Sequence, residues 1–133
     1  MKHFVVYHNP DSIGYPASRV SDLSIVTNKN ITDEILGSMI WLITGEGRPR
    51  NYYIVAQFIA SAVESGNDEG FSTRVKGHIG TIYKPMKPIS HCRWLRDFVR
   101  QMGNFALGMQ RITDETFVKG LEEASIGTHN QAL

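Results

Sequence analysis

Two arginines on a glycine-containing loop are the clearest candidates in this sequence for binding a phosphate group. Arg48 and Arg50 stand on either side of a proline within residues 45–51. Exposed backbone amides and guanidinium groups both donate hydrogen bonds to phosphate oxygens, and a guanidinium group can donate two at once. A charged connection between two strands would have the same composition, so the loop by itself leaves both interpretations open.

Aromatic and asparagine side chains gather where several of the expected strands end. Aromatic faces can sandwich a nucleobase, and an asparagine amide offers both a donor and an acceptor to the edge of a base. These residues are Tyr7 with His8 and Asn9, Trp41, and Asn104 with Phe105. Trp41 lies in the middle of an expected strand, where an aromatic residue fits the hydrophobic core equally well.

The sequence lacks the motifs by which many enzymes are recognised. It has no Gly-x-x-x-x-Gly-Lys loop, no Gly-x-Ser-x-Gly, no His-Glu-x-x-His and no pair of cysteines. The five histidines stand at no metal-ligand spacing. His91 and Cys92 are adjacent, and neighbours on a helix point about 100° apart, so we do not expect them to act as a pair. We therefore expect a binding protein rather than an enzyme, with no metal and no cofactor.

Positive charge is concentrated in one stretch of the chain. Residues 70–112 contain eight bases and one acid, a net charge of +7, whereas the remainder carries −6. A basic face attracts phosphates, although surface charge can also be no more than solvated surface. The residues expected to contact phosphate are Arg48, Arg50, Arg74, Lys76, Arg93, Arg96 and Arg100.

The hydrophobic pattern predicts six strands and three helices. The strands are expected near residues 2–8, 24–27, 39–44, 52–63, 71–83 and 105–112, and the helices near 31–37, 91–102 and 114–125. Long strands follow one another through short turns, one of them at 66–68. The helix that would separate parallel strands is mostly missing. We expect an α+β fold, with a bent, mostly antiparallel sheet or partly closed barrel and helices covering its ends.

Local signals fix several details of these elements. Ser90 is expected to cap the second helix and Thr113 the third. The second helix should bury Leu95, Phe98 and Val99 and expose Arg93, Arg96 and Arg100. The strand at 71–83 should place Phe71, Val75 and Ile79 on one face and Arg74, Lys76 and His78 on the other. Two prolines within residues 84–88 exclude a helix there.

The length of 133 residues suits one domain, which we expect to span residues 1–127 with a flexible tail at 128–133. No apolar run approaches the roughly 20 residues needed to span a membrane, so no membrane association is expected. Cys92 is the only cysteine and cannot form an internal disulfide, which is typical of a reducing compartment. We expect a cytoplasmic protein.

Four motifs give the chain a resemblance to the PUA-like superfamily, which includes the EVE, YTH, ASCH and SRA domains. They are Tyr7-His8-Asn9, residues 41–47 (Trp-Leu-Ile-Thr-Gly-Glu-Gly), residues 48–53 (Arg-Pro-Arg-Asn-Tyr-Tyr) and residues 104–112 (Asn-Phe-Ala-Leu-Gly-Met-Gln-Arg-Ile). Among these domains the chain most resembles the EVE-like module at the N-terminus of modification-dependent HNH endonucleases. The resemblance covers essentially the whole chain.

The resemblance implies a bent PUA-like β-barrel with about three covering helices, whose mouth binds a flipped or single-stranded modified base in an aromatic pocket. It places the following residues near that pocket: Tyr7, His8, Asn9, Thr27, Asn28, Trp41 and Asn104. The implied partner is DNA or RNA that carries a modified base. We expect cleavage to require a separate nuclease, because no nuclease motif follows the module. A protein-interaction or regulatory module and a small nucleotide-processing enzyme remain the alternatives.

Overall fold

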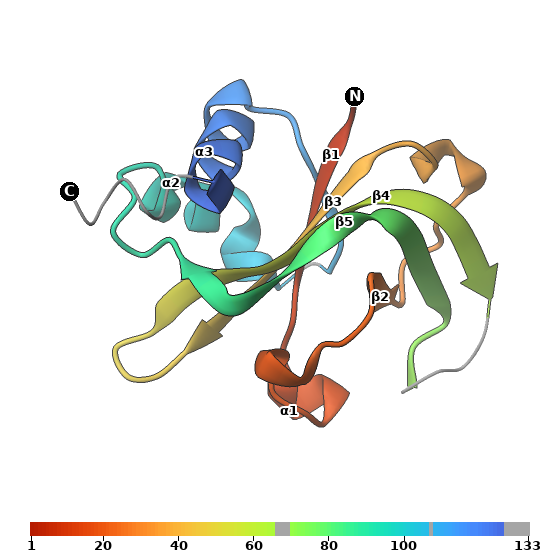
Figure 1. Cartoon of the computed structure of the whole chain (residues 1–133), viewed down its shortest axis with the longest axis horizontal. Coiled ribbons are helices and arrows are strands. Elements are labelled where there is room, and N and C mark those ends of the chain that lie inside the picture. The colour runs from red at the N-terminus through yellow and green to blue at the C-terminus, as the bar shows by residue number, and fades with distance from the viewer. Residues whose placement is uncertain (66–69, 107, 127–133) are drawn as a thin grey trace.

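The computed structural model describes residues 1–65, 70–106 and 108–126, and has the α+β composition predicted from the sequence. Figure 1 shows the elements. The strands are β1 His3–Tyr7, β2 Ser24–Thr27, β3 Met39–Glu46, β4 Asn51–Ser65, β5 Thr73–Pro88 and β6 Gln110–Ile112. The α-helices are α1 Pro10–Ile13, α2 Leu95–Gln101 and α3 Glu115–Ile126. The 3-10 turns that lie wholly within the described residues are η1 Ala17–Arg19, η2 Asp33–Ile35 and η4 Gly103–Phe105. The turn predicted at 66–68 and the tail predicted at 128–133 lie outside the described residues.

All six strands belong to one sheet, in the order β2-β5-β4-β3-β1-β6. Four of the five neighbouring pairs are antiparallel, and only β1 and β3 run parallel, so the prediction of a mostly antiparallel sheet is confirmed. The edge strands β2 and β6 are not hydrogen-bonded to each other in the described part of the chain, and the sheet is therefore not closed into a barrel.

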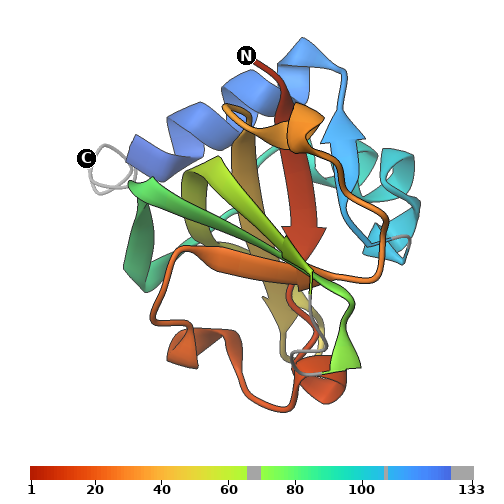
Figure 2. The ribbon, with the colours of Figure 1, turned by 90° about the vertical axis from the view of Figure 1, so that its right-hand side faces the viewer.

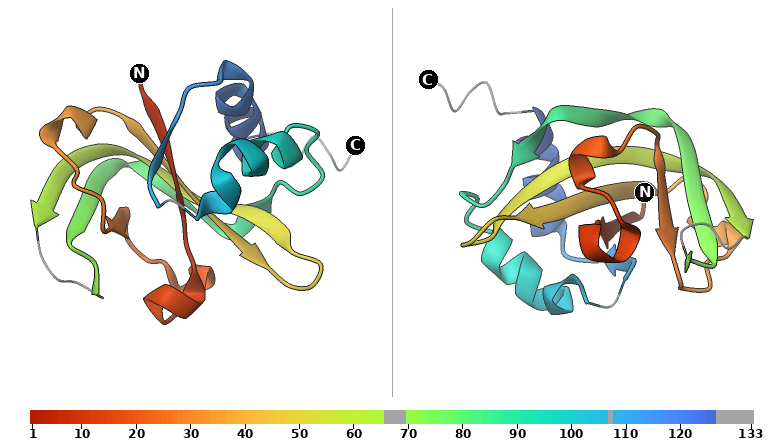
Figure 3. Two further views of the ribbon diagram at one scale, coloured as in Figure 1. Left: turned by 180° about the vertical axis from the view of Figure 1, so that it is seen from behind. Right: turned by 90° about the horizontal axis from the view of Figure 1, so that it is seen from below.

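The sheet bends most strongly along β4 and β5, which Figure 3 shows as two long curved strands lying side by side. The pairing between them shifts register at three steps, which is how β-bulges introduce curvature. Gly80 lies against the neighbouring strand, where a Cβ atom would collide with the carbonyl oxygen of Gln57. One bulge interrupts the expected alternation in β5. Val75 is fully buried, but Ile79 is 68% exposed, so the prediction that they share a face is wrong.

The two faces of the sheet bury two separate hydrophobic cores. Val5 and Trp41 belong to the helix-side core, which α2 and α3 cover. Val6 and Leu42, one residue further along the same strands, belong to the second core on the other face. Strand alternation explains this division, because successive side chains point to opposite faces. Figure 1 shows α2 and α3 together on one side of the sheet and α1 at the far end of β1.

The helices differ from their predicted bounds for identifiable reasons. The hydroxyl of Ser90 does not cap a helix but accepts a hydrogen bond from the backbone N–H of Tyr52 at 2.7 Å, and α2 begins only at Leu95. The helix expected at 31–37 is the single 3-10 turn η2. Helix α1 lies in a segment predicted as loop, and the Asn9 side chain caps it. Within the described ranges, every helix is too short or too polar to cross a membrane.

The strand predicted at 105–112 is shorter than expected. Only Gln110–Ile112 pairs with β1, and Phe105, where the strand was expected to begin, is the last residue of the 3-10 turn η4. Asn104 and Phe105 have φ angles of 57° and 62°, in the left-handed region that strands do not use. The chain therefore turns sharply here before it enters the sheet.

Candidate functional site

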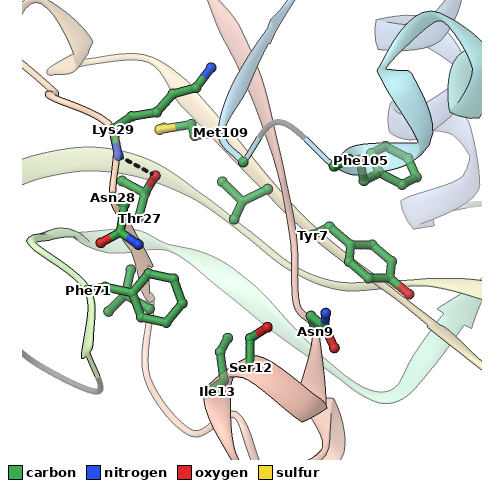
Figure 4. A pocket seen from close by; sticks show the side chains of 14 residues that line it. Tyr7, Asn9, Ser12, Ile13, Thr27, Asn28, Lys29, Phe71, Phe105 and Met109 are labelled. Carbon is green, nitrogen blue, oxygen red and sulfur yellow. Dashed lines mark hydrogen bonds between the residues drawn. The ribbon is translucent and has the colours of Figure 1, made fainter.

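A cavity of about 470 Å³ lies where the two edges of the sheet approach each other. Four segments that are distant in sequence surround it (Figure 4): the end of β1 with α1, the end of β2, the residue Phe71 before β5, and residues 105–106 with 108–109 before β6. Figure 2 shows β2 crossing in front of β1 on this side of the molecule. The volume is within the range of roughly 300–1,000 Å³ that is usual for small-ligand pockets. We call this cavity the seam pocket.

Aromatic rings form two sides of the seam pocket. The ring of Tyr7 stacks on Phe105 with a centroid distance of 5.4 Å and an interplanar angle of 4°. Phe105 is only 6% exposed, so it supports Tyr7 from behind. Phe71 is half-buried, belongs to neither core, and lies across the pocket from Tyr7 (Figure 4). An aromatic ring at this position can stack on a flat ligand.

The hydroxyl of Tyr7 points away from the pocket, toward Gly45 and Arg50. A Cβ atom at Gly45 would lie 2.8 Å from the Tyr7 hydroxyl and 2.6 Å from Cδ of Arg50, so glycine is required for this close approach. Burial raises the pKa of the Tyr7 phenol above its ordinary value, although the nearby Arg50 guanidinium acts in the opposite direction. Tyr7 thus connects the pocket to the arginine-bearing loop.

Three of the polar residues that line the pocket were predicted: Asn9, Thr27 and Asn28. The Oδ1 atom of Asn9 accepts a hydrogen bond from the N–H of Asp11 at 3.0 Å, and Oδ1 of Asn28 accepts one from Ser72 at 3.1 Å. The Thr27 hydroxyl accepts from the N–H of Lys29 at 3.1 Å. These hydrogen bonds orient the three side chains around the cavity.

A second hollow adjoins the seam pocket and is lined by basic side chains, and we call it the basic groove. Its polar residues include Arg50, Arg93, Arg96, Arg100 and Asn104. All four arginines are exposed, while Leu95 and Phe98 behind them are buried, as the helical spacing predicts. Val99, predicted to be buried with them, is half-buried. Asp97 also lines the groove and lies 3.8 Å from Arg100, but both side chains are more than two-thirds exposed and the pair is weak.

The turn at Asn104 and Phe105 separates the two hollows. Phe105 lines the seam pocket, while its neighbour Asn104 lines the basic groove. Both residues adopt left-handed backbone angles, which cost about 1–2 kcal/mol each for residues other than glycine. Strain of this kind is concentrated at functional sites. The predicted pocket residue Asn104 therefore faces the groove rather than the pocket.

Two further residues predicted for the base pocket lie elsewhere. Trp41 is 1% exposed in the helix-side core, because strand alternation points it under α2 and α3, and its Nε1–H donates to Nδ1 of His3 at 3.0 Å. His8 is 2% exposed and does not line the seam pocket. Its ring is buried beside Tyr15, with Nε2 at 2.8 Å from the Tyr15 carbonyl oxygen. Both predictions are wrong in placement, and both side chains hold the fold together.

The predicted phosphate ligands divide into two groups and one separate residue, Arg48. Arg50, with the arginines of residues 93–100, lines the basic groove, whereas Arg74 and Lys76 lie on β5 beside a different surface hollow. Arg74 donates to the Ser24 hydroxyl at 2.8 Å, and Lys76 lies 3.4 Å from Glu64. Arg48 is exposed on the loop between β3 and β4 and lines neither the pocket nor the groove.

His91 and Cys92 come closer than the sequence suggests, because both precede α2 rather than lie on it. Sγ of Cys92 is 3.9 Å from Nε2 of His91. Burial raises the pKa of the Cys92 thiol, which disfavours the reactive thiolate. Among the described residues, no three His, Cys, Asp or Glu side chains gather closely enough to hold a metal ion.

Several residues of the seam pocket carried no signal in the sequence. They are Ser12, Ile13, Lys29, Phe71 and Met109. Phe71 reaches the pocket because β2 pairs with β5, which brings Thr27 opposite Thr73. Only this long-range pairing could have identified it.

No protein-family model, curated protein or solved structure matches this chain. The resemblance to PUA-like modules is therefore carried by the sequence motifs alone.

Proposed function

We propose that this chain is a non-catalytic nucleic-acid-binding module that holds one unpaired base, flipped or single-stranded, in the seam pocket. One observation carries this proposal: the seam pocket and the basic groove lie on the two sides of the turn at Asn104 and Phe105. The pocket contributes aromatic and amide side chains, and the groove contributes arginines. A base in the pocket would stack on Phe71, and its neighbouring phosphates would lie along the groove. Flipping a base out of a duplex costs a few kcal/mol, which stacking and edge contacts must offset.

The proposal extends to the fold and to the ligand. The strand order and the approach of both edge strands at the pocket are compatible with an incompletely closed barrel of the PUA-like type. The pocket volume of about 470 Å³ is large enough to hold a base that carries an added group. DNA or RNA with such a base is the proposed partner, and a separate nuclease is the proposed means of any cleavage.

A binding screen tests the proposal directly. The chain would be titrated with fluorescent single-stranded and duplex oligonucleotides, with and without methylated or hydroxymethylated bases, and anisotropy would be recorded at several salt concentrations. We expect salt-dependent binding that is tightest for a single-stranded or flipped modified base. The absence of measurable binding to every oligonucleotide at low salt would refute the proposal.

The basic groove can be tested with a charge-matched pair of variants. Replacing Arg93, Arg96 and Arg100 together by Ala should weaken binding to all sequences alike and flatten the dependence of log K on log salt by about 0.7–0.9 per lost phosphate contact. The control replaces three exposed bases outside the groove, Lys2, Arg19 and Lys119, by Ala. Equal salt slopes for the two variants would show that the groove makes no phosphate contacts.

A further inference from the structure

The chemical character of the seam pocket depends on how two asparagine amides are oriented. In each case a backbone N–H group fixes the orientation: Asp11 donates to Oδ1 of Asn9 at 3.0 Å, and Ser72 donates to Oδ1 of Asn28 at 3.1 Å. An N–H donor can pair only with the oxygen of an amide and not with its NH₂ group. The NH₂ groups of both side chains are therefore the ends left for a ligand.

These two NH₂ groups face the pocket from different sides. Figure 4 shows Asn9 at the start of α1 and Asn28 after β2, each with its nitrogen on the side turned toward the cavity. Both side chains are exposed, and no acceptor within the described ranges is hydrogen-bonded to either nitrogen. Each NH₂ group can donate a hydrogen bond, and neither can accept one.

The hydroxyl groups of Thr27 and Ser12 add a hydrogen-bond donor to the pocket or are compatible with a pocket rich in donors. Oγ1 of Thr27 already accepts the N–H of Lys29 at 3.1 Å, so its own hydrogen remains to be donated. Ser12 lines the pocket between the two amides in Figure 4, and its hydroxyl can donate or accept. The cavity therefore offers an excess of donors at its polar edge.

We infer that the seam pocket selects a base of the pyrimidine-2,4-dione class, which comprises uracil, thymine and their derivatives substituted at C5. This inference rests on the proposed function. Such a base carries carbonyl oxygens at O2 and O4, on either side of N3–H. The amides of Asn9 and Asn28 would donate to the two oxygens, and the hydroxyl of Ser12 would accept from N3–H. A substituent at C5 lies on the opposite side of the ring from O2 and is accommodated by the remaining cavity.

The same donors disfavour the other bases. Cytosine and adenine carry an amino group where the dione has a carbonyl oxygen, so a donor would face a donor, which leaves both unpaired in a partly buried site. Guanine presents acceptors at O6 and N7 but donors at N1 and N2. Selectivity by polar complementarity of this kind is strong because mismatched groups lose their hydrogen bonds to water as well.

The test compares the affinity of the chain for single-stranded oligonucleotides that are identical except for one central base. Uracil and thymine should bind about 5-fold or more tightly than cytosine, adenine and guanine. Equal affinity for all five strands, or preference for an amino-bearing base or for guanine, would overturn the inference while leaving the proposed function intact. Absence of binding to any strand would instead refute the proposed function.

Aspartate variants provide the sharper test. Asn9→Asp and Asn28→Asp keep the oxygen that accepts the backbone N–H, so the fold is preserved, but they replace the donor in the pocket by an acceptor. The ratio of uracil to cytosine affinity should fall toward one or reverse in each variant. The ratio is the readout because the added negative charge weakens binding of every strand. Asn30→Asp, outside the pocket, introduces the same charge and should keep the wild-type ratio. An unchanged ratio in both pocket variants would overturn the inference, and if they fail to fold, the wild-type ratios decide it.

Discussion

Removal of the Phe71 ring should abolish much of the binding while leaving the fold intact. Stacking of one base on an aromatic side chain contributes about 1–3 kcal/mol, so Phe71→Ala should raise Kd by about 5- to 150-fold for any strand that places a base in the pocket. Phe71 is half-buried and belongs to neither hydrophobic core, so the same change should lower the free energy of unfolding by only about 1 kcal/mol.

A comparison with Phe105 makes this expectation specific. Phe105 is 6% exposed and contacts Tyr7, Tyr52 and Phe98, so Phe105→Ala should cost about 3–5 kcal/mol of stability. Phe71→Tyr, which retains the ring, should bind like the wild type. Fluorescence anisotropy would give Kd, and urea unfolding followed by circular dichroism would give the free energy. Wild-type affinity in Phe71→Ala, or a loss of stability as large as that of Phe105→Ala, would refute the placement of Phe71 as a stacking residue outside the core.

Three further outcomes follow from the structure. Trp41→Ala should lower the free energy of unfolding by about 3–5 kcal/mol, and the fraction that remains folded should bind with wild-type affinity; selective loss of binding at unchanged melting temperature would contradict its core position. Burial lowers the pKa of His3 below its ordinary value of 6.5, and its unprotonated Nδ1 accepts a hydrogen bond from Trp41. The contribution of neutral His3 to the free energy of unfolding should therefore be complete above about pH 6.5 and be lost as pH falls through the lowered pKa. Urea unfolding at a series of pH values would show it, and His3→Asn should flatten that part of the profile. Gly45→Ala should displace Arg50 and Tyr7 and weaken oligonucleotide binding by about 1 kcal/mol at nearly unchanged melting temperature; wild-type affinity would show that their packing at Gly45 is not needed for binding.

The sequence predicts the strands well where local signals and burial agree. The bounds of β2 are as predicted, and α3 differs from its predicted bounds by one residue at each end. Ser90 shows the limit of such reasoning. Its type and position are those of a helix cap, yet its hydroxyl accepts from Tyr52, and no local pattern reveals a partner 38 residues away.

The segment around Phe105 misleads for a different reason. Residues 105–112 were predicted as a strand, but the backbone angles at Asn104 and Phe105 are left-handed, and the Phe105 ring packs against Tyr7. The prolines in β5 were correctly taken to exclude a helix. The strand nevertheless continues past Pro85, because the register shift there leaves Tyr83 to Met86 unpaired and no ladder hydrogen bond requires a proline N–H.

The candidate site was predicted in part for the same reasons. Tyr7 and Asn9 were selected as aromatic and amide side chains at a strand end, whereas Thr27 and Asn28 were implied only by the resemblance to PUA-like modules. The structure brings these four together around one cavity. Trp41 was misplaced because residue type cannot tell which face of a strand is covered by helices. The face of Trp41 follows from its register with Val5, which is a property of the assembled sheet.

The polar and aromatic edge of the seam pocket lies outside the two cores, which has a consequence for how the sequence of this chain could change. Asn9, Ser12, Asn28 and Phe71 line the cavity but belong to neither core, and three of them lie in loops or turns. Substitutions at such positions typically cost little folding free energy. The chemistry of the cavity can therefore be altered residue by residue on an unchanged framework, which makes this scaffold suitable for libraries selected for new base specificities.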